Sequence, residues 1–238
     1  MFEGMKRRAI VPIVALSCLL TACTIDISDD RRPLHEEPVS VDLGSAVRAD
    51  VQFHLGAGRL EIRGGSEKLL DGTLRYSSGA GRPQVRSSVN GSFASVTVEQ
   101  RHNATFGNNR TEWDVRLNDK VLMDLRLHCG AGQAELSLGD LALQNVEVHM
   151  GAGQVDLDLR GHPTHDYDAD IEGGVGQATV HLPEGVGIRV EAHGGIGSVT
   201  VTGLDKNGDH WQNSLYDNSK VNVRLRVHGG IGEIRIVG

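Results

Sequence analysis

The sequence predicts an all-β fold, a single-stranded parallel β-helix (β-solenoid) of about six short rungs with an antiparallel hairpin cap. Three observations favour this class. A motif of small residues recurs six times, and each copy is followed by a stretch in which apolar and polar residues alternate. Outside the N-terminal apolar run, no stretch shows helical periodicity. Repeats of short strands bury a shared core by stacking, which is typical of a solenoid.

The recurring motif is a Gly-x-Gly corner, as in HMGAGQVDL at 149–157. From the second copy onward its first glycine recurs after 21, 23, 21 and 35 residues. A nucleotide-binding glycine loop occurs once and opens a helix, whereas strand-like stretches follow the copies here. We therefore interpret the glycines as structural turns, where a side chain would obstruct the bend. They are Gly56, Gly58, Gly130, Gly132, Gly151, Gly153, Gly174, Gly176, Gly195, Gly197, Gly230 and Gly232.

The repeat that follows the second corner predicts a roughly triangular coil of three short strands. Ala134, Leu136 and Leu138 alternate inward, and further bends are expected at Gly139 and Asn145. Stacked coils would pair in parallel at about 4.8 Å. We expect the middle residue of each corner to point inward, into a core that widens toward the C-terminus as this residue grows. These residues are Ala57, Ala131, Ala152, Val175, Ile196 and Ile231.

Two segments interrupt the stack within the predicted solenoid, 45–238. The first, about 84–119, contains Asn90-Gly91 between alternating runs, which is a strong hairpin signal. We expect it to cover the N-terminal end of the solenoid as an antiparallel cap. The second, 204–219, is expected to bulge from a corner as a loop. IRIV directly precedes the final Gly238, so we expect an open last rung through which the protein could self-associate.

The N-terminus has the features of a secretory signal in residues 1–22. A basic Lys6-Arg7-Arg8 precedes an apolar run that is too short to span a bilayer permanently. Leu-Thr-Ala-Cys at 20–23 resembles the lipobox of bacterial lipoproteins, in which the cysteine is lipid-modified. Cys23 is therefore the predicted lipid-attachment residue. Residues 23–44 are polar and contain two prolines, which predicts a flexible acylated tether.

The mature chain is expected to be acidic and to be held at the membrane by lipid. The whole chain has a formal net charge of −7, and the signal contributes +2, because three basic residues outweigh Glu3. Its removal leaves −9, which argues against nucleic acid and against electrostatic adhesion to anionic lipid. By the rule for lipoproteins, aspartate after the cysteine retains the protein at the inner membrane. Thr24 stands there, so we expect the outer membrane or the cell surface.

Several longer stretches resemble a known family. LGAGRLEIRGG at 55–65, EWDVRLND at 112–119, LMDLRLHCGAGQAELSLGDLALQNVEV at 122–148 and the closing HGGIGEIRIVG are similar to bacterial toast-rack domains. These are LiaF-like β-solenoid proteins, which include adhesin-like domains and domains of unknown function. The resemblance covers roughly residues 45–238, and its motifs mark fold and not chemistry. It implies a non-enzymatic envelope protein, and LiaF-like relatives, held by transmembrane helices, act in sensing envelope stress.

The best candidate site is a column of side chains beside the corners. Five histidines and one glutamate each precede the first corner glycine by two positions, on the outer face of the coil. Stacking would place neighbours about 4.8 Å apart, close enough to couple their pKa values or to share Zn²⁺. The alternative is a solvated ladder, because a zinc site gathers three or four ligands around one point. The column comprises His54, His128, His149, Glu172, His193 and His228.

Two polar columns flank the histidines and offer a face to a glycan or a protein partner, or simply to solvent. The first contains Gln52, Arg126, Glu147, Asp170, Glu191 and Arg226, and the second contains Arg59, Gln133, Gln154, Gln177, Ser198 and Glu233. Stacked glutamines of the second column can form amide ladders. Cys129 is the one cysteine of the predicted solenoid, so it cannot form an intramolecular disulfide and is expected to be a buried filler.

Other chemistry is weakly represented. Asp205-x-Asn207-x-Asp209 is similar to the start of a calcium loop, but Tyr216 stands where a glutamate is needed. Trp211, Leu215 and Tyr216 are instead expected to pin this loop to the solenoid. Asp114, Asp119 and Asp124 are close in sequence, and parallel β-helices include glycan-active enzymes, but aromatic residues make up only 4% of the chain. A glycan-active site would also require a cleft with paired carboxylates.

The sequence therefore predicts a non-enzymatic, lipid-anchored envelope protein, acting as an adhesin-like or scaffold module with a role in the envelope-stress response. The first alternative is a zinc-binding protein that uses the histidine column, and the second is a glycan-binding or glycan-active β-helix. No cofactor is expected other than zinc under the first alternative. The expected partners are the membrane, through the lipid, and an envelope protein or a cell-wall glycan, with no nucleic acid.

Overall fold

The computed structural model describes residues 34–100 and 109–238, which form strands and connecting turns. The predicted signal (1–22) and Cys23 lie outside the described residues. Within the described ranges no helix is long and apolar enough to cross a membrane. The strands belong to one continuous sheet system, so the predicted all-β class is confirmed.

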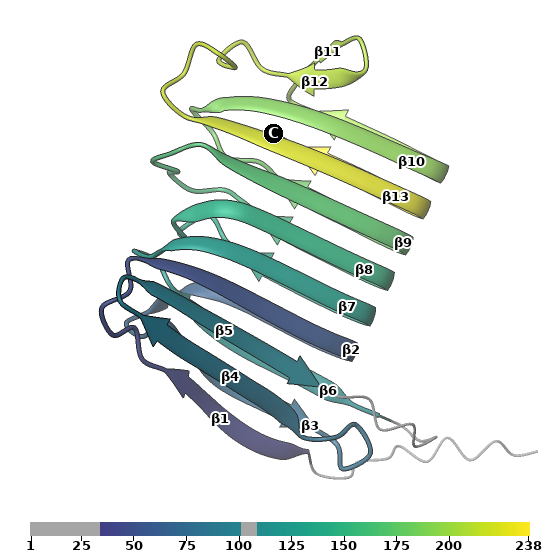
Figure 1. Ribbon diagram of the computed structural model, residues 1–238. Coiled ribbons are helices and arrows are strands. Elements are labelled where there is room, and N and C mark those ends of the chain that lie inside the picture. Colours follow the sequence, from purple (N-terminus) through teal and green to yellow (C-terminus); the bar gives the residue numbers. More distant parts are fainter. Residues whose placement is uncertain (1–33, 101–108) are drawn as a thin grey trace, which may run out of the picture. The chain divides into compact units, whose positions relative to one another are not determined.

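Six long strands form the body of the fold, and each bends once at its Gly-x-Gly corner (Figure 1). The bend places the two halves of each strand in two facing sheets, which we call layer A (before the corner) and layer B (after it). Neighbouring strands pair in parallel and in register, so corner stacks on corner. The predicted β-solenoid is confirmed. Its rungs are, in spatial order, β2 (Arg48–Ser66), β7 (Leu122–Ser137), β8 (Leu143–Asp158), β9 (Tyr167–His181), β13 (Asn222–Val237) and β10 (Gly187–Thr202).

Each coil has two long sides and is not triangular. The expected bend at Asn145 is absent, because β8 runs without interruption from Leu143 to Asp158. The pairing of β7 with β8 shifts by one residue near Gln144, which absorbs the irregularity as a bulge. Asn145 then donates a hydrogen bond from Nδ2 to Asp124 Oδ1 on the adjacent rung at 2.6 Å. Its side chain therefore links two rungs and does not mark a corner.

The last two rungs do not follow sequence order. The C-terminal strand β13 lies between β9 and β10, and pairs with both in parallel. The longer step of 35 residues before the last corner gives the chain enough length to return past β10. The segment expected to bulge from a corner contains the short hairpin of β11 (Asp205–Asn207) and β12 (His210–Gln212). β12 pairs with β10 at Arg189 and Val190, so the terminal rung is β10 and is partly covered.

Five shorter strands extend the two layers at the N-terminal end of the stack. Layer A continues through β5 (Phe93–Gln100) to the edge strand β4 (Pro83–Asn90), and these two form a hairpin that turns at Gly91. Layer B continues through β6 (Thr111–Asn118) to the antiparallel β3 (Leu70–Tyr76) and β1 (His35–Val41). β5 and β6 are both parallel to β2, so they extend the solenoid as an incomplete rung.

Strand β1 corrects the expected extent of the tether. Residues 23–44 were expected to be flexible, but His35–Val41 pairs with β3 along its whole length. Val39 and Val41 are buried at 7% exposure, and this burial stabilises a segment whose composition suggests a linker. Pro38 is tolerated because β1 is the edge strand of the sheet.

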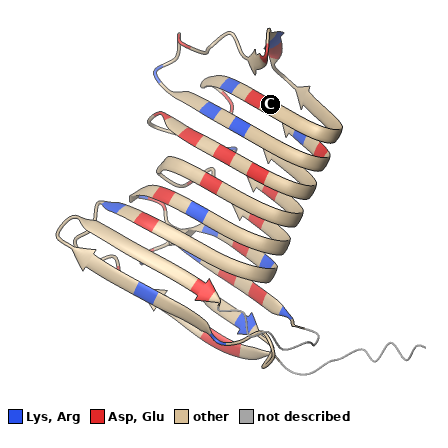
Figure 2. Ribbon diagram, turned by 45° about the vertical axis from the view of Figure 1, so that its right-hand side comes forward, with Lys and Arg blue, Asp and Glu red and all other residues tan. Residues whose placement is uncertain are grey.

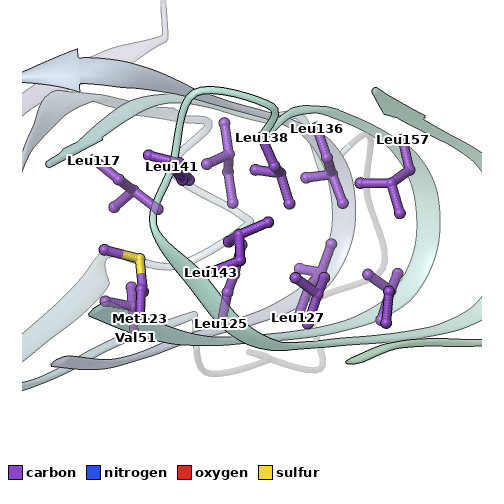
Figure 3. Packing of buried hydrophobic residues seen from close by; sticks show 14 of the residues in the cluster. Val51, Leu117, Met123, Leu125, Leu127, Leu136, Leu138, Leu141, Leu143 and Leu157 are labelled. Carbon is purple, nitrogen blue, oxygen red and sulfur yellow. The ribbon is translucent and has the colours of Figure 1, made fainter. Parts of the chain in front are cut away.

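The core lies between the two layers and is almost entirely aliphatic. Figure 3 shows two facing rows of side chains, with Leu136, Leu138 and Leu157 in one row and Leu125 and Leu127 in the other. These residues are at most 1% exposed, because the side chains of adjacent rungs pack against one another and exclude water. Cys129 belongs to the same cluster. Burial raises the pKa of its thiol to about 11, which leaves it protonated at neutral pH.

The corner glycines permit a backbone approach that no other residue allows. Gly153 has a φ of +138°, and a Cβ on it would lie 1.9 Å from the carbonyl oxygen of Gly132 on the adjacent rung. Both the conformation and the contact therefore require hydrogen in place of a side chain. The second glycine of the other five corners has a φ between 135° and 149°. A repeated backbone requirement thus explains the sequence repeat.

The middle residues of the corners point outward, contrary to the sequence-based expectation. Val175, Ile231 and Ile196 are 53%, 51% and 72% exposed, although they stand in register on β9, β13 and β10. Ala131 and Ala152 are also exposed. The core does not widen toward the C-terminus through these residues. At a corner the strand turns about its own axis, so the simple alternation of inward and outward side chains is not maintained across it.

Candidate functional site: the histidine groove

An open groove of about 1030 Å³ runs along layer A beside the corners. Its length comes from stacking, because each rung contributes the same three positions before the bend. Every member of the histidine column except His193 lines the groove, together with corner glycines. Among its lining residues are His54, His128, His149, Glu172, His228, Gly130, Gly151 and Gly230, with Arg86, Glu99 and Gln100 at the N-terminal end.

The histidine column is real, and its first three imidazoles stack almost parallel. The ring centroids of His54 and His128 are 4.9 Å apart with planes 6° from parallel, and those of His128 and His149 are 4.8 Å apart at 1°. This spacing equals the distance between paired strands, so the rung repeat sets it directly. His193 and His228 form a second stacked pair at 5.3 Å.

Two carboxylates interrupt or end the column. Glu172 lies between His149 and His228, and His149 Nδ1 donates to Glu172 Oε2 at 3.0 Å. Glu99 pairs with His54 in register, so it occupies the same place on the incomplete rung. Sequence reasoning missed Glu99 because no glycine corner follows it. The signal was available in the alternation of Val96, Val98 and Gln100, which matches the inward pattern of the rungs.

Protonation of His128, the middle ring of the stack, is opposed by its environment. Burial lowers the pKa of His128 below its ordinary value of 6.5, and the positive charges that His149 and His54 would carry lower it further. Glu147 acts in the opposite direction as a weaker influence. At neutral pH the His128 imidazole is therefore neutral, with one donor and one acceptor nitrogen.

Ion pairs between rungs neutralise much of the charge beside the column. Arg226 donates to Asp170 from Nε at 2.5 Å and from Nη2 at 2.7 Å, and this pairing lowers the pKa of the Asp170 carboxyl. Arg126 contacts Asp50 on one neighbouring rung and Glu147 on the other. Figure 2 shows acidic and basic bands on neighbouring strands of the sheets. The flanking column is thus a cross-strand charge ladder.

The column does not converge on a metal. Within the described ranges, no group of three or more His, Cys, Asp or Glu side chains is arranged to hold a metal ion. A straight column offers each point between two rungs only two imidazoles, whereas zinc requires three or four ligands around one point. The described residues therefore do not favour the zinc alternative.

The other sequence candidates are dispersed. Asp114 pairs with Arg63, Asp119 Oδ1 accepts from the Gly65 amide, and Asp124 accepts from Asn145. They have separate structural partners and do not form a catalytic pair. In the hairpin, Asp209 pairs with His210, while Lys206 lies 5.1 Å from the ring centre of Trp211. Trp211 packs on the core as expected, but Leu215 is 40% exposed and does not pin the loop.

The fold and the groove define a class of protein: a two-layered β-solenoid that displays stacked polar columns beside a glycine corner. The chain belongs to the toast-rack family. The family model described as "N-terminal domain of toast_rack, DUF2154" matches residues 30–181. A second model, described as "Cell wall-active antibiotics response LiaF, C-terminal", matches residues 131–236. The family resemblance drawn from the sequence is confirmed.

Solved structures agree with this assignment. A crystal structure of a "putative cell adhesion protein" from Clostridium sporogenes ATCC 15579 is 32% identical, with a TM-score of 0.81, over 86% of this chain and 99% of that one. A "putative adhesin" from Bacteroides fragilis NCTC 9343 is 9% identical over 86% of this chain and 97% of that one, with a TM-score of 0.28. No curated protein sequence matches the chain at a significant level.

Proposed function

We propose that the protein is a lipid-anchored, non-catalytic interaction module of the bacterial envelope, which receives an extended partner along the histidine groove. The observation that carries the proposal is the open groove of about 1030 Å³ on a surface of repeated, in-register side chains. Two comparisons support a place in the bacterial cell envelope. One matching family model is described by its response to cell wall-active antibiotics, and the similar clostridial structure is called a putative cell adhesion protein.

The geometry of the groove favours binding over hydrolysis. Its lining carboxylates, Glu99 and Glu172, stand four strands apart along the stack. At about 4.8 Å per strand this separation is roughly 19 Å. Glycosidases hold their two carboxyl groups within about 10 Å of each other, so this pair cannot act on one glycosidic bond.

The repeat favours a partner that is itself extended. The stacked histidines of β2, β7 and β8 present ring nitrogens for hydrogen bonds every ~4.8 Å, beside exposed corner glycines. A polypeptide or glycan strand of the cell envelope could lie along several rungs and form the same hydrogen bonds on each. Affinity would then come from many weak contacts, which suits an adhesin-like or scaffold role.

The groove is tested by cross-linking in intact envelopes. Replacing the stacked pair by His128→Ala and His149→Ala should abolish a cross-linked partner that the unaltered protein captures. The matched control is Gln133→Ala with Gln154→Ala, which changes the same two rungs on layer B and should leave capture intact. If both double variants capture the same partner equally, the groove is not its binding site.

The anchor is tested independently of the groove. Mass spectrometry of the mature N-terminus should find a diacylglyceryl-modified Cys23, and the protein should fractionate with membranes. Cys23→Ala should remain unmodified and should wash off the membrane fraction on dilution, where the lipidated protein is retained, because the variant lacks the acyl chains. An unmodified Cys23 in the native protein would contradict lipid anchoring.

A further inference from the structure

Three large apolar side chains form a ridge on the outside of the corner edge, on rungs that have glycine at the last inward position before the corner. Val175, Ile231 and Ile196 stack in register with more than half of each residue exposed. A crevice between these rungs is lined by apolar residues and glycines, including Ile171, Gly194 and Gly229. Exposed apolar groups of this kind normally mark a place of contact, because water solvates them poorly.

The ridge arises because the large and the small side chain change places between two positions of the repeat. One is the last inward position before the corner, and the other is the middle of the corner. In the first three rungs, the last inward residue before the corner is Leu55, Cys129 or Met150, and the middle residue of the corner is alanine. In the last three, the inward residue is glycine and the middle residue is valine or isoleucine. A Cβ added to Gly173 would meet no atom within 4 Å, whereas one on Gly194 would lie 3.1 Å from Val199 and one on Gly229 3.0 Å from Ile234. In each of these three rungs the larger apolar side chain of the two positions therefore lies at the exposed corner.

The corner edge is also where the chain enters the fold. His35 pairs with Tyr76, Tyr76 pairs with Thr111, and the Thr111 carbonyl lies against the corner glycine Gly58. Figure 1 shows that β1 begins on the same side of the stack as the bends of the rungs. The 12 residues from Cys23 to Leu34 can span at most about 40 Å when fully extended. An acyl group on Cys23 would therefore keep the start of β1, on the corner side of the stack, within about 40 Å of its membrane.

Charge favours the same orientation. The Gly-x-Gly triplets carry no charge, and Figure 2 shows the bends as uncharged bands between faces that carry acidic and basic residues. On either side of the triplets lie mostly histidines and uncharged polar residues. The acidic body would be repelled by a membrane surface if it approached with a face, whereas the edge can approach without that cost.

We propose that the corner edge rests on the bilayer that holds the Cys23 lipid, with Val175, Ile231 and Ile196 inserted at the interface. The ridge supplies the second membrane contact that a single lipid anchor needs for a fixed orientation. The histidine groove then lies beside the membrane surface. The orientation rests on the proposed lipid anchoring, whereas the membrane affinity of the ridge does not.

The orientation is tested with the full-length lipidated protein in proteoliposomes of phosphatidylethanolamine and phosphatidylglycerol. Ser198→Cys, beside the ridge, and Asp140→Cys, on the opposite turn, are each labelled with an environment-sensitive fluorophore. The protonated thiol of Cys129 remains unlabelled at neutral pH. Spin-labelled lipid should quench the label at position 198 several-fold more than that at 140. Equal quenching would overturn the orientation.

The affinity of the ridge is tested without the lipid. The mature chain carrying Cys23→Ser should float with concentrated vesicles, and Val175→Ser, Ile231→Ser and Ile196→Ser together should weaken binding by at least about tenfold. The matched control, Val85→Ser, Val89→Ser and Phe93→Ser, removes three exposed apolar side chains from β4 and β5 and should leave binding unchanged.

A gain-of-function variant guards against misfolding as the explanation. Ala131→Ile with Ala152→Ile extends the ridge along the exposed corner of β7 and β8 and should strengthen vesicle binding. If neither the serine nor the isoleucine variants alter flotation, the ridge proposal is wrong. If they do alter it while native Cys23 proves to carry no lipid, the ridge stands and the lipid-anchored function falls.

Discussion

At the scale of single residues, the hydrogen on each corner glycine is the most demanding requirement of the sequence. Gly153 combines a positive φ with a contact that leaves no room for a methyl group. Gly173, on the next rung, is a glycine without either restriction, because its φ is not positive and the space around it is open. Gly153 is therefore required by the backbone conformation, whereas Gly173 is a position that could accept a small side chain.

We therefore predict that Gly153→Ala destabilises the protein by about 3 kcal/mol or more, through strain and a clash with the adjacent rung. Gly173→Ala should change the free energy of unfolding by less than about 1 kcal/mol. Chemical denaturation of the two variants provides the measurement. Similar losses in both would show that the corner conformation is not the cause of the glycine repeat.

The imidazole stack predicts a dependence of stability on pH. The pKa of His128 is lowered in the fold, so the unfolded chain binds more protons once the pH falls through the ordinary value of about 6.5. The contribution of neutral His128 is thus fully present above that pH and is lost below it, toward its lowered pKa.

The melting temperature should consequently fall between pH 7 and pH 5, and His128→Gln should reduce this fall because glutamine does not titrate. Thermal unfolding across that range, with His35→Gln as a control outside the column, gives the comparison. An unchanged pH profile in the His128 variant would mean that the stack does not oppose protonation.

At the scale of elements, the alternation of residues and the glycine corners predict where the strands lie in the sequence. They do not predict which strands lie side by side in the sheet. The inward residues of β7 and β8 follow directly from the alternation of Leu125, Leu127, Val146 and Val148. The place of β13 between β9 and β10 could not be read in the same way, because all three strands offer nearly identical inward patterns. The step length of 35 residues permits the insertion without requiring it.

The terminal position of β10 predicts uneven local stability. Its layer B half pairs only with β13 among the described strands, and Val199 and Val201 are only partly buried. The equivalent half of β8 has a partner on both sides, and Val155 and Leu157 are at most 2% exposed.

Amide hydrogen exchange should therefore be at least about tenfold faster at Val199 and Val201 than at Val155 and Leu157, because end rungs open with less loss of buried surface. The exchange can be followed by mass spectrometry of peptides from the native protein. Equal protection would indicate that something covers the β10 edge in solution, and the self-association expected from the sequence would then be the first explanation to examine.

At the scale of the whole molecule, the stacked repeat determines which features of the structure can be predicted from the sequence and which cannot. It reveals the solenoid and the histidine column, because both depend on residue spacing within one rung. It conceals Glu99, which lies in the column without a corner beside it, and strand β1, whose burial comes from a partner distant in sequence. The outward direction of Ile196 is set by backbone rotation at the corner, which residue type does not encode.

The stacking of corners in a fixed spatial order is the central claim, and the distance between spin labels tests it most directly. Labels at His54→Cys with His228→Cys, and at His54→Cys with His193→Cys, span four and five strand spacings. At ~4.8 Å per spacing, pulsed electron resonance should give separations of roughly 19 Å and 24 Å. Position 193 lying nearer to position 54 than position 228 does, or separations unrelated to this spacing, would contradict the account.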